Sequence, residues 1–159
     1  MPTKPLTLPA FDPASAPESR GSSYPSPFRE RVAGRSKLRL GETVGLTQFG
    51  VNLVTLQPGF ESSMRHWHTR EDELVYVLEG ELVLVTDKGE QVLTAGMACG
   101  FEAGAKDGHQ LVNRSKAPAR YLEIGTRDPN DECDYPDVDL LVRLIDGEQK
   151  FVHKDGKPY

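Results

Sequence analysis

Short apolar runs separated by turn signals every eight to twelve residues occupy the chain between residues 36 and 126. This spacing is typical of an all-β sandwich or barrel. The 3.6-residue periodicity of an amphipathic helix is absent from the same stretch. Pro58-Gly59 and Ala95-Gly96 are examples of the dipeptides that mark the turns. We expect strands at residues 36–40, 47–57, 63–68, 72–79, 81–87, 90–94, 97–102, 108–113 and 118–126.

The segments on either side of this region differ from it in character. Residues 1–35 contain prolines at positions 2, 5, 9, 13, 17, 25 and 27, which cannot sustain a helix or a central strand. We expect an extended arm there, with Phe11, Tyr24 and Phe28 as apolar anchors. The tail 127–159 contains the β-branched run 137–145 and then Asp146-Gly147, which favours a strand followed by a hairpin into 149–153. The predicted organisation is an arm (1–35), a barrel (36–126) and a tail that packs on the barrel (127–159).

Two neighbouring predicted strands, DELVYVLEG and ELVLVTD, are apolar on both faces, whereas a strand with one solvated face alternates. If Glu73 and the two valines that share its parity face the barrel interior, then Leu74, Tyr76 and Leu78 face outward. The sequence therefore predicts that the outer face is covered, by the arm, by the tail or by a second subunit.

Composition narrows the classes of partner. The chain has 159 residues and a formal net charge of −5, which argues against nucleic acid or an anionic membrane as the main partner. The amino-terminal residues lack the apolar run of a signal peptide, and no segment reaches the roughly 18 apolar residues of a membrane span. The two cysteines, Cys99 and Cys133, fit free thiols in a reducing cytosol better than a disulfide framework. We therefore expect a soluble, cytoplasmic protein with a small-molecule ligand.

Three of the four histidines fall in one arrangement that suits a metal ion. His66 and His68 are two residues apart on a predicted strand and so point to the same face. Glu73 opens the next strand, and His109 follows in a later one. Three imidazoles and one carboxylate suit one divalent transition metal per chain, such as Fe, Mn, Ni, Co or Zn, and leave coordination positions open. Glu71 and Asp72 are the competing carboxylates, but Glu73 alone opens the apolar strand.

Other pocket candidates follow from their place near these ligands. Asn113 shares the parity of His109, and Lys106 lies in the loop before it. On the strand 118–126, either Tyr121 and Glu123 or the alternate residues, including Arg120, face the interior; the sequence leaves the parity open. No catalytic residue is assigned.

The spacing of these residues resembles the two signature motifs of the cupin superfamily. The first motif is matched by Gly59, His66, His68, Glu73 and Gly80, with one extra residue after Gly59. The second is matched by Gly96, Gly104, His109 and Asn113, with Glu102 in place of the usual proline and a longer gap before the histidine. The resemblance spans roughly residues 45–126 and implies a small single-domain cupin. It therefore implies a double-stranded β-helix (jelly-roll) barrel, here with an N-terminal arm and a C-terminal hairpin, and it favours a homodimer.

The segments RYLEIGTRDP and DYPDVDL resemble stand-alone bacterial cupins, some of which are labelled sugar-phosphate isomerases. Three hypotheses follow: an isomerase or epimerase of a sugar or sugar phosphate, a metal-dependent oxygenase, and a non-catalytic module that binds or senses a small molecule. A phosphate substrate would need convergent basic side chains. The sequence offers only Lys106 and Arg120 for that purpose, which counts against a sugar phosphate.

Overall fold

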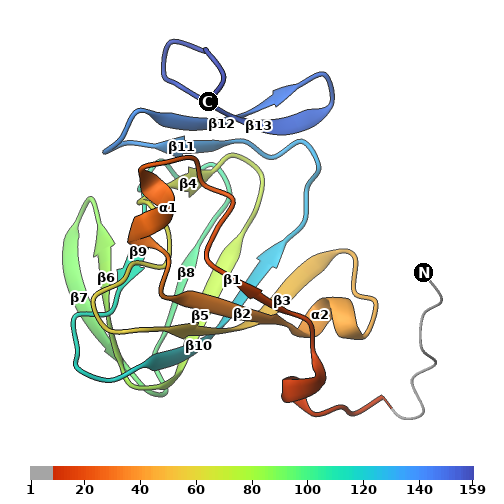
Figure 1. Ribbon diagram of the computed structural model, residues 1–159, viewed down its shortest axis with the longest axis vertical. Helices are drawn as coiled ribbons and strands as arrows, with labels where there is room; N and C mark the ends of the chain where they lie inside the picture. Colours follow the sequence, from red (N-terminus) through yellow and green to blue (C-terminus); the bar gives the residue numbers. More distant parts are fainter. Residues whose placement is uncertain (1–8) are drawn as a thin grey trace.

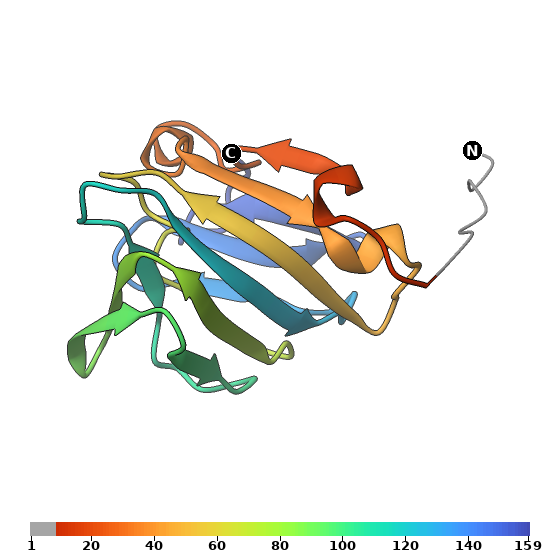
Figure 2. The same cartoon turned by 90° about the horizontal axis from the view of Figure 1, so that it is seen from below.

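The protein is described by a computed structural model that covers residues 9–159, and within that range it consists of antiparallel β-sheets (Figure 1). One sheet has six strands, in the order β1-β2-β3-β10-β5-β8, and Figure 2 shows these strands side by side. A second sheet has the order β7-β6-β9, and a third has the order β13-β12-β11-β4. The strands of the first two sheets are β1 (Glu18–Arg20), β2 (Arg35–Arg39), β3 (Phe49–Leu56), β5 (Glu73–Glu79), β6 (Glu81–Thr86), β7 (Gly89–Thr94), β8 (Ala98–Phe101), β9 (Gln110–Val112) and β10 (Ala119–Thr126). Those of the third are β4 (Trp67–His68), β11 (Cys133–Tyr135), β12 (Leu140–Ile145) and β13 (Glu148–Val152). The all-β prediction is confirmed.

The alternation along β5 decides which residues face the barrel interior. Val75 and Val77 are buried, whereas Leu74, Tyr76 and Leu78 are 44%, 41% and 38% exposed. The predicted parity of this strand is therefore confirmed, and neither the described part of the arm nor the tail covers the outer face.

A tight turn at Gly80 joins β5 to β6. Gly80 has φ +79°, and a Cβ at this position would lie 2.9 Å from the carbonyl oxygen of Pro118. Only glycine fits that backbone without a clash.

The strand expected at 63–68 is much shorter than predicted. Only Trp67–His68 forms a strand, β4, while His66 makes an isolated bridge to His109. The backbone N–H of Ser62 donates to Leu111 O at 2.8 Å, so this segment joins the neighbouring strand at separate points rather than along a continuous ladder.

The arm is more ordered than its prolines suggest. Pro13–Ser15 forms a 3-10 turn, β1 pairs with the edge of β2, and Phe28–Arg31 forms a single helical turn, α1. The expectation of no helix was wrong at that point, because Pro25 and Pro27 precede the turn and a proline is tolerated before or at a helix start. Residues 1–8 lie outside the described range, so prolines 2 and 5 are not tested. A second single turn, α2 (Leu40–Thr43), follows β2.

The C-terminal hairpin is confirmed. β12 and β13 pair from Ile145 and Glu148 onward, and Asp146 and Gly147 at the turn have φ 54° and 80°. In Figure 1 the strands β11, β12 and β13 lie across one end of the barrel, close to α1. No helix within residues 9–159 is long and apolar enough to span a membrane.

Two apolar clusters result from this arrangement. The first fills the barrel and consists of Val54, Leu56, Val75, Val77, Leu82, Leu84, Leu93, Leu111, Ala119 and Tyr121. The second joins the arm to the tail and consists of Tyr24, Phe28, Val32, Met64, Cys133, Tyr135, Leu140 and Val142. The predicted anchors Tyr24 and Phe28 are 7% and 9% exposed, whereas Phe11 is only partly buried.

Candidate metal centre

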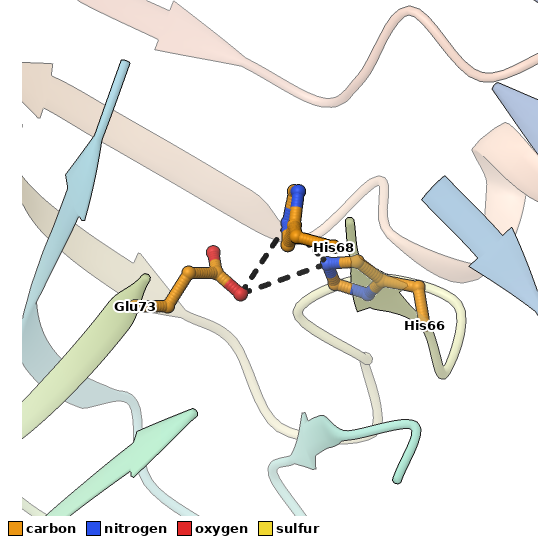
Figure 3. Close-up of side chains that lie close together, drawn as sticks. All are labelled: His66, His68 and Glu73. Carbon is orange, nitrogen blue, oxygen red and sulfur yellow. Dashed lines mark hydrogen bonds and ion pairs between the residues drawn. The ribbon is translucent and has the colours of Figure 1, made fainter. Parts of the chain in front are cut away.

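His66, His68 and Glu73 point toward one another from the segment around β4 and from the start of β5 (Figure 3). The Nε2 atoms of His66 and His68 are 3.2 Å apart, and Glu73 Oε2 lies 3.8 Å and 3.4 Å from them. The Nε2 atom of His109, just before β9, lies 2.6 Å from the same oxygen. Two nitrogens bound to one ion at about 2.1 Å are roughly 3.0–3.4 Å apart at octahedral or tetrahedral angles. The donor set therefore fits a divalent transition metal.

The surroundings of His66 leave its Nε2 atom available as a ligand. Its Nδ1 lies 2.9 Å from Met64 O, so a proton on Nδ1 can be donated to that carbonyl. Tyr135 stacks on the ring at 5.5 Å. Burial lowers the pKa of His66 to about 4, which keeps the imidazole neutral, as a metal ligand must be.

A buried carboxylate outside the predicted set holds His68. Asp131, which is 1% exposed, places Oδ2 at 2.6 Å from His68 Nδ1. Its Oδ1 accepts a hydrogen bond from the backbone N–H of Arg70 at 2.7 Å. Cys133 Sγ is 3.2 Å from the same imidazole nitrogen. This is the arrangement in which a carboxylate fixes a histidine so that the other ring nitrogen faces a metal.

The charges within the cluster are strongly coupled. Burial alone would lower the pKa of His68, but hydrogen bonds to Cys133 and Glu73 raise it to about 12. Burial would likewise raise the pKa of Glu73, but hydrogen bonds from His109 and His68 hold it well below its usual value. Glu73 is therefore an ionised carboxylate, and a divalent cation could replace the proton that His68 otherwise carries.

His109 is held on its other side by an aromatic ring. Phe101 stacks on it with a centroid distance of 3.6 Å and an interplanar angle of 3°. His109 Nδ1 is buried and has no hydrogen-bond partner within the described chain. Phe101 packs against the first apolar cluster, and Tyr135, which stacks on His66, belongs to the second. The candidate metal ligands therefore lie where the two apolar clusters meet.

A cavity of about 230 Å³ opens onto these side chains. Two of the predicted pocket residues, Tyr121 and Glu123, line it, which settles the parity of β10: the odd-numbered residues face inward. Glu71 also lines the cavity, but the mutually close donor atoms are those of Glu73 rather than Glu71.

The other predicted pocket residues lie elsewhere. Asn113 is fully buried, but its Nδ2 donates to Leu56 O and Ala117 O at 2.8 Å and 2.9 Å, so it fixes a loop. Lys106 is exposed, and its Nζ lies 6.0 Å from the centroid of the Trp67 ring. Neither Asn113 nor Lys106 lines the cavity. Arg120 is paired with Glu79 at 2.8 Å. The expectation that basic groups at the site would come only from Lys106 and Arg120 was wrong.

Three other basic residues line the cavity: Arg35, Lys37 and Arg127. Arg35 and Lys37 alternate along β2, and this parity is the signal that could have revealed them once β2 was placed beside β3. Arg127 follows β10, and its guanidinium packs where a Cβ on Gly50 would lie. The cavity is therefore basic on the wall formed by β2 and near the end of β10.

Comparisons with known proteins agree with this architecture. The family model for the cupin domain matches residues 52–125. A crystal structure of a cupin-superfamily protein named as a sugar phosphate isomerase, from Silicibacter pomeroyi, is 47% identical, with a TM-score of 0.90 over 95% of this chain and 96% of that one. A protein of Acidithiobacillus ferrooxidans, provisionally named as a sugar phosphate isomerase, is 31% identical with a TM-score of 0.71 over 79% and 80% of the two chains. The tetracenomycin polyketide synthase protein TcmJ of Streptomyces glaucescens is 31% identical over 72% of this chain and 75% of its own.

Proposed function

Because the chain belongs to the cupin superfamily, we propose that it is a metal-dependent isomerase of a small sugar phosphate. The observation that carries the proposal is one small cavity lined both by the cluster of three histidines and Glu73 and by the basic residues Arg35 and Lys37. The similarity to two proteins named as sugar phosphate isomerases supports the same class of substrate.

In this proposal one divalent transition metal is held by His66, His68, Glu73 and His109. Bound there, such an ion would polarise a carbonyl or hydroxyl oxygen of the substrate and stabilise negative charge on it. The three imidazoles are neutral ligands, so Glu73 supplies the only negative charge of the set, and an anionic substrate is still attracted.

Glu123 is the residue that we propose moves the proton between two carbons of the substrate. Its Oε1 accepts hydrogen bonds from Lys37 at 2.6 Å and from Asn52 at 3.1 Å, which fixes the carboxylate in the cavity wall. Burial would raise the pKa of Glu123, but the ammonium of Lys37 keeps it below its usual value. Glu123 is therefore ionised at neutral pH and can accept a proton, and its second oxygen has no partner among the hydrogen bonds of the described chain.

The proposal can be tested in two stages. The metal content of the purified full chain should be one divalent ion per chain by elemental analysis. A Co(II)-substituted protein should change its visible spectrum when small hydroxy-acids or sugar phosphates are added, because the four ligands leave coordination positions open.

The second stage follows the reaction itself. Aldose and ketose phosphates of three to six carbons should exchange a carbon-bound proton in D₂O, observed by NMR, only when the metal is present. Metal binding with no exchange on any of these sugars would contradict the isomerase. Oxygen consumption by the Fe(II) form on adding a substrate would instead indicate an oxygenase.

A further inference from the structure

Outside the candidate metal centre, where His109 Nδ1 is also without a partner, two residues that line the cavity have a buried hydrogen-bonding atom with no partner within residues 9–159: Arg35 at Nε and Tyr121 at Oη. Tyr121 is only 1% exposed, so water does not reach its side chain freely. Burying a donor without a partner is unfavourable, and native proteins rarely do so unless another molecule completes the bond. Two such atoms on residues that line one small cavity point to a ligand with acceptor oxygens.

The charge of Arg35 is also uncompensated. Two of its five N–H groups donate to backbone carbonyls, those of Ser62 and of Gly21, the latter at 2.9 Å. No carboxylate of the described chain lies within 4.0 Å of its guanidinium, whereas the nearby Glu123 is neutralised by Lys37 at 2.6 Å. A partly buried guanidinium that binds only neutral carbonyls retains its positive charge for a ligand.

The sheet register brings these two residues to the same wall. Arg35 on β2 pairs with Leu56 of β3, and Tyr121 on β10 pairs with Val54 of the same strand. Because neighbouring strands are about 4.8 Å apart, β2 and β10 are separated by roughly 10 Å across β3. An arginine side chain and a tyrosine side chain can converge over that distance. The metal-ligating residues come from other segments, so this wall is a second region of the cavity.

We propose that Arg35 and Tyr121 form an oxyanion subsite that binds the phosphate or carboxylate group of the substrate. A guanidinium offers several parallel N–H donors to such a group, and the tyrosine hydroxyl adds one more. This proposal rests on the proposed function in one respect: the anion bound here would be one end of a substrate whose other end reaches the metal. Binding of the anion itself requires neither the metal nor turnover.

The test is titration of the full chain with inorganic phosphate by calorimetry at constant ionic strength, in metal-free protein. Saturable binding is expected, weakened at least about tenfold by Arg35→Met, which removes a charge-assisted contact, and several-fold by Tyr121→Phe. Arg39→Met and Tyr76→Phe are matched controls, because Arg39 lies on the same strand and pairs with the exposed Glu42, and Tyr76 faces outward. Both controls should bind phosphate as the wild type does.

Acetate and malonate titrated in the same way distinguish a phosphate subsite from a carboxylate subsite. The proposal is overturned if none of these anions binds saturably to the wild type, or if Arg35→Met and Tyr121→Phe both leave the affinity unchanged. If Arg35→Met does not fold, Tyr121→Phe decides, since it removes one hydroxyl and retains the packed ring. Failure of the proposed isomerase would appear separately, as missing metal or missing proton exchange, while phosphate binding to metal-free protein persisted.

Discussion

Asp131→Asn should weaken metal binding without unfolding the protein. In the structure Asp131 Oδ2 lies 2.6 Å from His68 Nδ1, and the side chain is almost completely buried. The hydrogen bond fixes the orientation of the imidazole and makes its other nitrogen a stronger donor. Asparagine has nearly the same shape and keeps one acceptor oxygen for the backbone N–H of Arg70, so the loop should be preserved while the negative charge is lost.

The size of the effect follows from the role of the carboxylate. Loss of such a partner of a ligating histidine typically costs 10–100-fold in metal affinity, about 1.4–2.7 kcal/mol. We therefore expect the apparent Kd for Zn²⁺ or Co²⁺, measured by competition with a chromogenic chelator, to rise by that factor. At saturating metal the stoichiometry should remain one ion per chain. Circular dichroism should report an unchanged β-rich fold.

Asp139→Asn provides a matched control. Asp139 makes the same kind of contact, with Oδ2 at 2.8 Å from His153 Nδ1, but the pair is exposed and lies outside the candidate metal centre. Its metal affinity should equal that of the wild type. If folded Asp131→Asn also bound metal within about twofold of the wild type, the argument that Asp131 orients a metal ligand would be refuted.

Three further predictions concern the site and the outer face. His66→Ala with His68→Ala should abolish stoichiometric metal, measured by elemental analysis, while the circular dichroism spectrum stays β-rich; full metal occupancy would contradict the ligand set. The exposed apolar face of β5 should form a homodimer interface, so light scattering should give twice the 17.6 kDa chain mass. Tyr76→Asp should lower the measured mass toward that of the monomer. A monomeric wild type would exclude this interface. Glu123→Gln should retain metal but lose proton exchange. The ion pair with Lys37 lowers the pKa of Glu123, so the ionised carboxylate stabilises the fold above its ordinary pKa of 4.5. This stabilisation is lost as the pH falls through the lower pKa of the folded state. Denaturant titrations should therefore show that acidification lowers the free energy of unfolding less in Glu123→Gln than in the wild type.

The strands and the histidine cluster could be predicted because their signals are local. The period of two residues along a strand places Val75 and Val77 on the face of Glu73, the expected metal ligand, and glycine at a turn is required by the backbone itself. The i, i+2 spacing of His66 and His68 likewise needs only strand geometry. Such signals survive without knowledge of which strands are neighbours.

The contribution of Asp131 could not be read from the sequence because it depends on a pairing between distant segments. Cys133 on β11 pairs with His68 on β4, and this register carries Asp131 to the imidazole. Nothing within the tail distinguishes Asp131 from the many other acidic residues there. The strand β11 itself is only three residues long, so its alternation is too short to stand out in the sequence.

The basic residues of the cavity were misassigned for a related reason. Lys106 is close to His109 in the sequence, but its loop lies at the surface. Arg120 is on a barrel strand, but its parity places its side chain on the outer face. Arg35 and Lys37 precede the first ligand by about thirty residues and reach the cavity only because β2 extends the sheet next to β3. Nearness in the chain was a poor guide to nearness in the barrel.

Some residues of the candidate site lie inside the segment that matches the cupin domain, and others lie outside it. The segment that matches the cupin domain, residues 52–125, contains the four proposed metal ligands together with Tyr121 and Glu123. Arg35 and Lys37 precede that segment, and Asp131 follows it. The metal-binding motif can therefore be shared by proteins that act on different substrates, because the charge of the cavity wall and the support of His68 are supplied by residues outside the matched segment. Under the proposed function, the basic wall is what favours an anionic metabolite over a neutral one, and substitutions on β2 should alter substrate choice while leaving metal binding unchanged.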